Sequence, residues 1–91
     1  MDEQRREVMI VNKRGLHARA SAKFVATVAQ MEGCQVTVSK DGSSAAGGSI
    51  LGLMMLGAAK GDTVELAVTG EAAEQRLAEL VAMIEDGFGE D

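Results

Sequence analysis

One histidine, His17, is the only imidazole in the chain, and basic residues lie on both sides of it. Lys13, Arg14, Arg19 and Lys23 are all within six positions of it. A neutral imidazole is a competent nucleophile at neutral pH, and an arginine provides a donor fork that matches the oxygens of phosphate. These residue types therefore favour covalent capture of an anionic group, such as a phosphoryl group, at His17.

The position of His17 between two predicted elements supports this chemistry. It follows a short apolar run at 8–11 and precedes a helical pattern that starts at Ala18. The N–H groups of a first helical turn have no acceptor within the helix, and together with the helix dipole they favour an anion. Gly15 permits a tight turn between the two elements. We therefore expect His17 and Arg19 to share an anion site, although a lone histidine can also simply cap a surface helix.

Other kinds of chemistry have weaker support in the sequence. His17 and Cys34 are one histidine and one cysteine, whereas metal sites usually use several such ligands. A Ser-His-Asp triad would need His17 with Ser21 or Ser49, and no nucleophile-elbow spacing is present. The glycines at 47–48 lack the spacing and the lysine of a P-loop. We expect no metal and no cofactor.

A second segment, 49–56, is unusually apolar for its length. Ser49 is a typical N-cap for a short helix after it. The apolar residues that follow outnumber those that one side of a two-turn helix can bury. Ile50, Leu51 and Met54 therefore either pack into the core or stay exposed as a docking patch, which methionine-rich surfaces suit. Both interpretations remain open at this point.

The composition limits the classes of function. With 91 residues the chain fits one domain, and we expect that domain to span 1–91 with a core at about 7–88. The absence of Trp and Tyr, only two Phe and a net charge of -5 argue against nucleic-acid binding. No apolar run approaches the length of about 20 residues that spans a bilayer. The N-terminus is polar, and the single cysteine cannot form an intrachain disulfide. We expect a cytoplasmic monomer.

Hydrophobic periodicity predicts seven elements in the order strand–helix–strand–strand–helix–strand–helix. An Asp-Gly turn at 41–42 is a strong hairpin signal between the second and third strands. The predicted elements are a strand at 8–11, a helix from Ala18 that Gly33 stops, strands at 34–39 and 43–46, a short helix at 50–56, a strand at 63–68 and a helix at 71–86. Residues 87–91 are expected to form a frayed acidic tail after Gly87.

The predicted helices are amphipathic. The apolar stripe of the first is expected to contain Ala18, Ala22, Val25, Ala26 and Ala29, and that of the last Ala73, Leu77, Leu80, Val81 and Ile84. Cys34 is expected to face the core as a structural residue. An antiparallel sheet with helices covering one face is the natural α+β arrangement of such elements.

Two motifs resemble those of a known family. Asn12-Lys13-Arg14-Gly15-Leu16-His17-Ala18-Arg19 resembles the active-site signature of HPr, the histidine-containing phosphocarrier family of the bacterial phosphoenolpyruvate-dependent phosphotransferase system. The segment from Ser49 to Met54, followed by 56–61, resembles the second signature of that family, around its regulatory serine. The two blocks have the usual separation, and the resemblance covers roughly residues 7–88.

The resemblance implies a role for each motif. His17 would accept a phosphoryl group at Nδ1 from Enzyme I, giving a pros-phosphohistidine, and Arg19 would help to hold it. The group would then pass to Enzyme IIA proteins for sugar uptake, so the chain would be a phosphocarrier and not an independent enzyme. Ser49 matches the position that HPr kinase/phosphorylase modifies. Partner docking falls on Ala20, Ile50, Leu51 and Met54. The implied fold is an open-faced β-sandwich, a four-stranded antiparallel sheet with three helices on one face.

The sequence departs from the family pattern at two places and leaves two other functions open. Family members usually have Pro where this chain has Ala20, a change that removes no reactive group, and Gly47-Gly48 replaces more ordinary residues before Ser49. One alternative is a regulatory binding protein controlled by phosphorylation of Ser49, since a phosphate there would add negative charge beside the apolar patch. The other is the same relay used for nitrogen or carbon signalling instead of sugar uptake.

Overall fold

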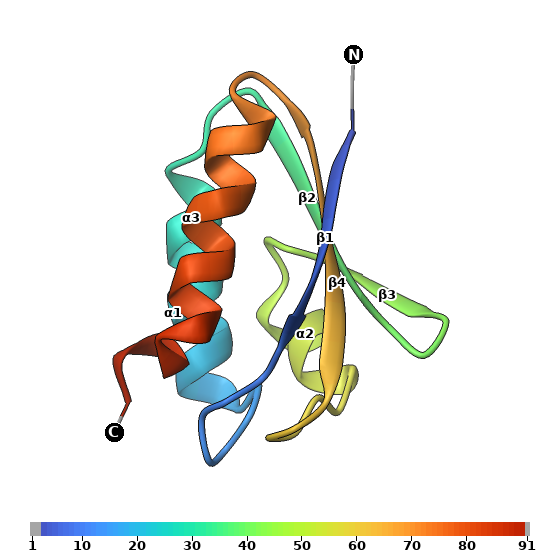
Figure 1. Cartoon of the computed structure of the whole chain (residues 1–91), viewed down its shortest axis with the longest axis vertical. Coiled ribbons are helices and arrows are strands. Elements are labelled where there is room, and N and C mark those ends of the chain that lie inside the picture. Colours follow the sequence, from blue (N-terminus) through green and yellow to red (C-terminus); the bar gives the residue numbers. More distant parts are fainter. Residues whose placement is uncertain (1–2, 91) are drawn as a thin grey trace.

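The computed structural model describes residues 3–90, and Met1, Asp2 and Asp91 of the expected frayed termini lie outside them. Within this range the chain forms one four-stranded antiparallel sheet with helices on one face (Figure 1). The elements are β1 (Gln4–Met9), α1 (Ala18–Ala29), β2 (Cys34–Lys40), β3 (Ser43–Ala46), α2 (Ile50–Met55), β4 (Thr63–Gly70), α3 (Ala73–Glu85) and the 3-10 turn η1 (Gly87–Gly89). The open-faced sandwich that the sequence implied is confirmed.

The strand order in the sheet is β1-β4-β2-β3. The central strand β4 pairs with β1 on one side, where Val8 lies opposite Val64, and with β2 on the other, where Val38 lies opposite Leu66. The predicted turn joins β2 to β3, with both of its residues, 41 and 42, at positive φ. The weak β-propensity of β3 is overcome by this turn and by pairing along β2.

The first strand differs from its prediction. Instead of a buried run at 8–11, β1 starts at Gln4 and ends at Met9. Val8 and Ile10 are buried, whereas Met9 and Val11 are exposed. An open-faced sheet covers only one of its faces, so side chains that alternate along the chain cannot all be buried. The apolar run is therefore split between the core and solvent.

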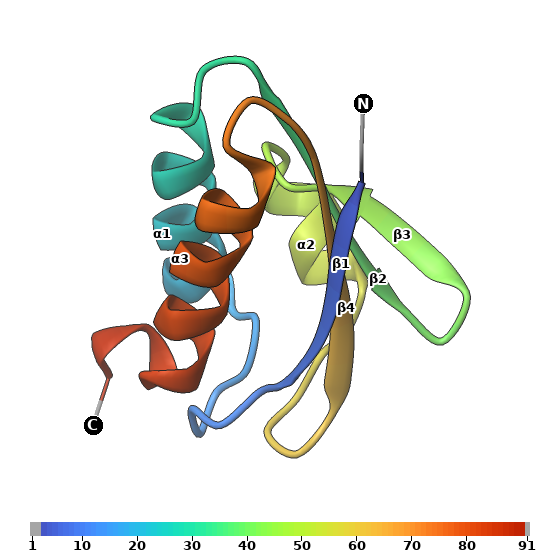
Figure 2. The same ribbon diagram turned by 45° about the horizontal axis from the view of Figure 1, so that its top comes forward.

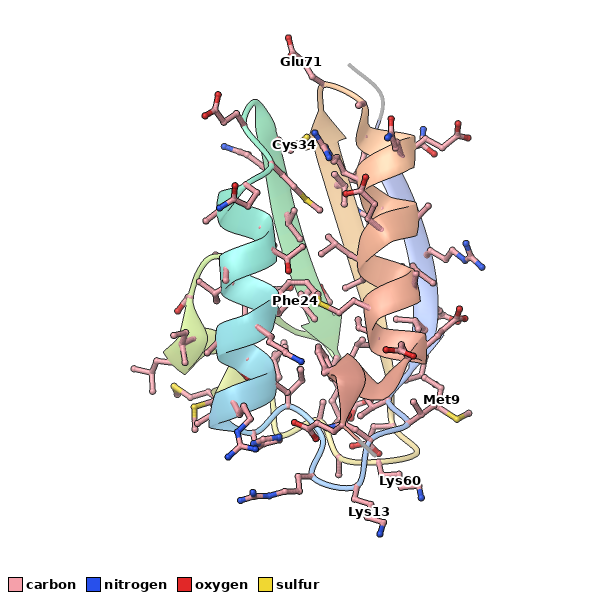
Figure 3. The ribbon with its side chains drawn as sticks, turned by 90° about the vertical axis from the view of Figure 1, so that its left-hand side faces the viewer. Met9, Lys13, Phe24, Cys34, Lys60 and Glu71 are labelled. Atoms are coloured by element: carbon pink, nitrogen blue, oxygen red, sulfur yellow. The ribbon has the colours of Figure 1, made fainter. Side chains whose placement is uncertain are left out.

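The buried face of α1 also differs from its prediction. Ala18, Ala22, Ala26 and Ala29 are exposed and Val25 is only partly buried, so the predicted stripe faces mainly outward. The buried residues are Ala20, Ser21 and Phe24. Phe24 lies between α1 and α3 (Figure 3). Leaving a phenylalanine in water costs far more free energy than leaving any one alanine there, which explains why the helix turns Phe24 toward the core.

The prediction for α3 is confirmed, because the five apolar residues expected on one face are all buried. Helices α1 and α3 run side by side over the sheet (Figures 1 and 2).

Cys34 is partly buried against the core, and its Sγ–H donates to the carbonyl oxygen of Glu71 at 2.8 Å. No helix within residues 3–90 has the length and the apolar character needed to cross a membrane.

The C-terminal segment contradicts the prediction of a frayed tail. Gly87 and Phe88 are buried, with the Phe88 side chain 1% exposed, and they continue from α3 into η1. Figure 1 shows this end of the chain returning to the end of the molecule where α1 begins. The aromatic ring supplies the reason, because its burial outweighs the entropy of an ordered terminus.

Candidate functional site

His17 lies at the start of α1, as predicted, and its ring faces the backbone of the first turn. It is the N-cap residue, and its Nδ1 accepts a hydrogen bond from the backbone N–H of Arg19 at 3.3 Å. The first intrahelical bond runs from the N–H of Ser21 to the carbonyl of His17. The N–H groups of residues 18–20 therefore have no acceptor within the helix, and they point out of its N-terminal end, beside Nδ1.

The second ring nitrogen contacts a residue from the other end of the chain. Nε2 of His17 lies 2.6 Å from Oε2 of Glu90, and the two side chains are 15% and 18% exposed. The ring is thus neither sealed in the interior nor fully open to solvent. The other oxygen of Glu90, Oε1, accepts from the side-chain amide of Asn12 at 3.1 Å.

The loop before His17 is fixed by backbone contacts. Asn12 is 2% exposed, and its amide nitrogen also donates to the carbonyl of Gly15 at 2.9 Å. Leu16 donates its N–H to the carbonyl of Ala58 at 2.9 Å, which ties the loop to the segment after α2. Gly15 has φ of 62°, and a Cβ there would lie 2.3 Å from the oxygen of Ala58. Only glycine meets both requirements.

The four basic residues that flank His17 in the sequence differ in their surroundings. Lys13, Arg14 and Arg19 are exposed. Figure 3 shows Lys13 and Lys60 projecting at the same end of the molecule, opposite the end that carries Cys34 and Glu71. Lys23 instead binds the C-terminal segment. Its Nζ donates to the carbonyl oxygen of Phe88 at 2.5 Å, which holds η1 against α1.

The electrostatics of the site act on the Glu90 carboxyl. Its pKa is lowered from the ordinary value of 4.5, first by the hydrogen bond from Asn12 and then by that from His17. The positive charge of Arg19 adds a smaller effect in the same direction. Glu90 is therefore a carboxylate at neutral pH, and it can only accept hydrogen bonds.

This arrangement provides a nucleophile with an anion site next to it. A group bonded to Nδ1 lies next to backbone N–H donors and the positive end of the α1 dipole. Exposed Arg19 is two positions from His17 on the first turn and can approach the same group. An anionic group on Nδ1 would be stabilised by all three, which is the requirement for carrying a phosphoryl group.

The alternative serines do not pair with His17. Ser21 is fully buried, and its Oγ donates to the carbonyl of Leu16 at 3.2 Å. Ser49 caps α2, as predicted, with its Oγ accepting from the N–H of Gly52 at 2.9 Å. Within residues 3–90 no three His, Cys, Asp or Glu side chains gather in a way that would hold a metal ion.

The apolar patch on α2 is exposed. Ile50, Leu51 and Met54 are 42%, 68% and 41% exposed, whereas Leu53 is buried. Core packing is therefore the wrong interpretation for these three residues, and their docking role stays a prediction. Met55, which is not among the predicted docking residues, is the most exposed at 77%. Helix α2 packs against α1, the helix that carries the site.

Ala20 corrects one docking assignment. Its exposed fraction is 0%, so its side chain offers no surface to a partner in this conformation. As the third residue of α1 it faces the core, whereas Ala18 and Arg19 on the same turn are exposed. We therefore remove Ala20 from the docking surface.

Two residues of the site, Asn12 and Glu90, are not predicted by the sequence patterns. Asn12 belongs to the motif around His17 but has no predicted role of its own, and Glu90 falls in the segment expected to be a frayed tail. The alternation of apolar residues gives no signal for a contact across 73 positions. The one available clue was Phe88, an aromatic residue beyond the last helix that would be costly to leave in water.

Comparisons with known proteins point to one family. Residues 4–86 match the family model described as the PTS HPr component phosphorylation site. The phosphocarrier protein HPr of Pseudomonas aeruginosa is 46% identical over 85 residues, which cover 92% of this chain and 93% of that protein. The phosphocarrier protein NPr of Escherichia coli is 34% identical over 84 residues, which cover 92% and 93%.

The fold is similar to that of a solved HPr. The crystal structure of HPr from Thermoanaerobacter tengcongensis superposes with a TM-score of 0.88 and 40% sequence identity, covering 100% of this chain and 99% of that one. The similarity therefore extends over the whole sheet, the helices and the segment that contains His17.

Proposed function

Because this chain belongs to the family of HPr components of the phosphotransferase system, we propose that it accepts a phosphoryl group from Enzyme I on Nδ1 of His17 and passes it to Enzyme IIA proteins. The observation that carries the proposal is the orientation of His17, whose Nδ1 faces the first-turn amides of α1. In this role the chain is a cytoplasmic, monomeric carrier within a transfer chain.

The geometry supports reversible transfer. The lone pair of Nδ1 attacks phosphorus, and the bond to the donor breaks with its electrons leaving on the donor. The backbone amides of the first turn are already in place to stabilise the phosphoryl oxygens, and the exposed guanidinium of Arg19 can approach the same oxygens. Since the ring stays partly exposed, a second protein can reach the phosphoryl group and remove it.

Incubation with Enzyme I and phosphoenolpyruvate tests the proposal. Mass spectrometry should show one added phosphate that is lost in acid, and His17→Ala should abolish it. Ser49→Ala is the matched control, because it removes the hydroxyl of the second motif and should leave the label in place. A label that survives in His17→Ala would contradict the assignment.

A second candidate is the same relay in nitrogen signalling, which the likeness to NPr favours. His17 would then be loaded in the same way, but the acceptor would be an Enzyme IIA of a nitrogen branch. Incubating the phosphorylated chain with sugar-type and nitrogen-type Enzyme IIA proteins separates the two, since the faster acceptor identifies the branch. We propose sugar uptake as the first candidate because the relatives named HPr share more identity with the chain.

Regulation through Ser49 by HPr kinase/phosphorylase is a further proposal for the same surface. Ser49 is partly exposed at the start of α2, next to exposed Ile50 and Leu51. A phosphate on its Oγ would add about two negative charges beside this apolar patch and weaken docking there. Detection of acid-stable phosphate on Ser49 after incubation with the kinase would support this, and unchanged partner binding by that form would contradict it.

A further inference from the structure

Glu90 lies near the C-terminus but contacts His17 near the N-terminus. The contacts of the His17 ring define its tautomer. A carboxylate can only accept, so the 2.6 Å contact places a proton on Nε2. The backbone N–H of Arg19 can only donate, so its contact requires a lone pair on Nδ1. Two independent contacts therefore select the same neutral tautomer.

Glu90 is itself held in place by a buried partner. Its Oε1 accepts from the amide nitrogen of Asn12, whose side chain is 2% exposed. Asn12 is anchored by its second bond, to the carbonyl of Gly15 in the loop that precedes His17. Each carboxylate oxygen thus has one donor, and the loop that positions the ring also positions the carboxylate.

The turn that carries Glu90 is strained and is held by three contacts. Gly87, Phe88 and Gly89 have φ of 67°, 58° and 74°. A phenylalanine is strained in this region, and such residues persist only where the surroundings enforce them. Burial of the Phe88 ring, the bond from Lys23 to the Phe88 carbonyl and the bond from the N–H of Glu90 to Gly87 do so.

We propose that Glu90 is a positioning residue that keeps the His17 ring in the Nε2–H tautomer, so that Nδ1 is unprotonated and its lone pair can exchange the Arg19 N–H for phosphorus during transfer. The inference rests on the proposed function and adds a residue to it. The strained turn η1 positions the Glu90 carboxylate next to the His17 ring.

The charge balance of the transfer step fits this role. When Nδ1 bonds to phosphorus, the ring keeps its Nε2 proton and gains one positive charge, while the electrons of the broken bond leave on the donor. The Glu90 carboxylate beside Nε2 offsets that charge. In the return step the P–N electrons go back to Nδ1 and the ring becomes neutral, so no further reactant is needed.

The first experiment measures the tautomer in the free chain, without any transfer. Nitrogen-15 NMR of the His17 ring above the ordinary titration range of histidine distinguishes protonated from unprotonated nitrogens. The unmodified chain should show a protonated Nε2 and an unprotonated Nδ1. In Glu90→Gln one amide oxygen replaces two carboxylate oxygens, so it cannot give Asn12 and His17 separate acceptors. We expect a mixture of tautomers in that variant.

The control variant is Glu85→Gln, which removes the same charge from an exposed residue at the end of α3 and should leave the tautomer unchanged. Predominant Nδ1–H in the unmodified chain would overturn the proposal. So would a Glu90→Gln ring with the same tautomer population as the unmodified chain.

The second experiment measures the rate of phosphorylation by Enzyme I under single-turnover conditions. Glu90→Gln should slow it about tenfold, by analogy with residues that orient a histidine through its second nitrogen, whereas Glu85→Gln should not. If the unmodified chain gains no phosphate on His17, the proposed function fails. If the unmodified chain is phosphorylated and Glu90→Gln is equally fast, the role of Glu90 alone fails.

Discussion

Arg19 and Glu90 bring opposite charges to the surroundings of a single imidazole, and they do so for different purposes. Glu90 contacts Nε2 of His17 directly. Arg19 contributes its backbone N–H to Nδ1, and its guanidinium is exposed. The carboxylate therefore acts on the ring, while the guanidinium is available for the oxygens of an incoming phosphoryl group.

Replacing Arg19 tests whether its guanidinium binds the phosphoryl group while its backbone N–H contacts the ring. Arg19→Ala removes the guanidinium but keeps the backbone N–H, so we expect the fold and the tautomer of His17 to be retained. The rate of phosphorylation should fall at least about tenfold, because a positively charged donor to the transferred group is lost. Arg6→Ala, an exposed arginine on β1, is the control and should keep the full rate.

The lowered pKa of Glu90 makes a prediction about acid stability. Its folded pKa lies below the ordinary value of 4.5, so the stabilisation it supplies is complete above that pH and is lost as the pH falls through the folded pKa. Glu90→Gln has no carboxyl to titrate at this position. The difference in Tm between the unmodified chain and Glu90→Gln should therefore shrink as the pH falls from about 5 through the folded pKa of Glu90. A difference that stays constant over this range would contradict the assignment.

At the scale of the elements, the site depends on two short connections and not on the helices alone. The loop from β1 to α1 sets the entry of His17, and η1 sets the approach of Glu90. Both contain glycine at positive φ, and both are fastened to a neighbouring segment, the first to Ala58 and the second to Lys23. A site assembled from such connections is sensitive to small backbone changes.

Gly15→Ala tests the first connection. The new Cβ would carry the cost of positive φ and would also lie 2.3 Å from a backbone oxygen that cannot rotate away. We expect the free energy of unfolding to fall by about 3 kcal/mol or more, as measured by chemical denaturation. Gly42→Ala is the matched control, since its φ is 85° but nothing lies within 4 Å of the added Cβ. It should cost only about 1 kcal/mol.

On the scale of the whole molecule, the carrier combines an acidic body with a basic site and an apolar surface. The net charge is -5, yet six of the nine basic residues lie within residues 1–24. Helix α2 places its exposed apolar residues beside α1, which carries the site. This combination fits a protein that must recognise partners and transfer a group while docked to them.

Leu51→Glu tests the docking surface. Leu51 is 68% exposed, so a charge there should leave the fold intact and oppose burial against a partner. We expect transfer from the phosphorylated chain to Enzyme IIA to slow at least about tenfold at limiting acceptor concentration. Gln35→Glu, an exposed residue on β2, adds the same charge and should transfer at the full rate. Equal rates for Leu51→Glu would remove α2 from the docking surface.

Local signals in the sequence were enough to predict the order of the elements and the place of His17. The hairpin turn at 41–42, the caps of α1 and α2 and the buried face of α3 all depend on neighbours within a few residues. The two motifs likewise identified the family. Such features are determined by backbone conformational preferences and short-range hydrogen bonds, which a linear pattern records directly.

The tertiary structure alone decided which face of α1 is buried and which residues complete the site. The orientation of α1 follows from packing Phe24 beside α3, and an alanine-rich pattern does not reveal it. The ordered C-terminus follows from burial of Phe88, which brings Glu90 to a histidine 73 positions away. Both results depend on how side chains from several elements pack together in one core. That packing is determined only when all of the elements are present.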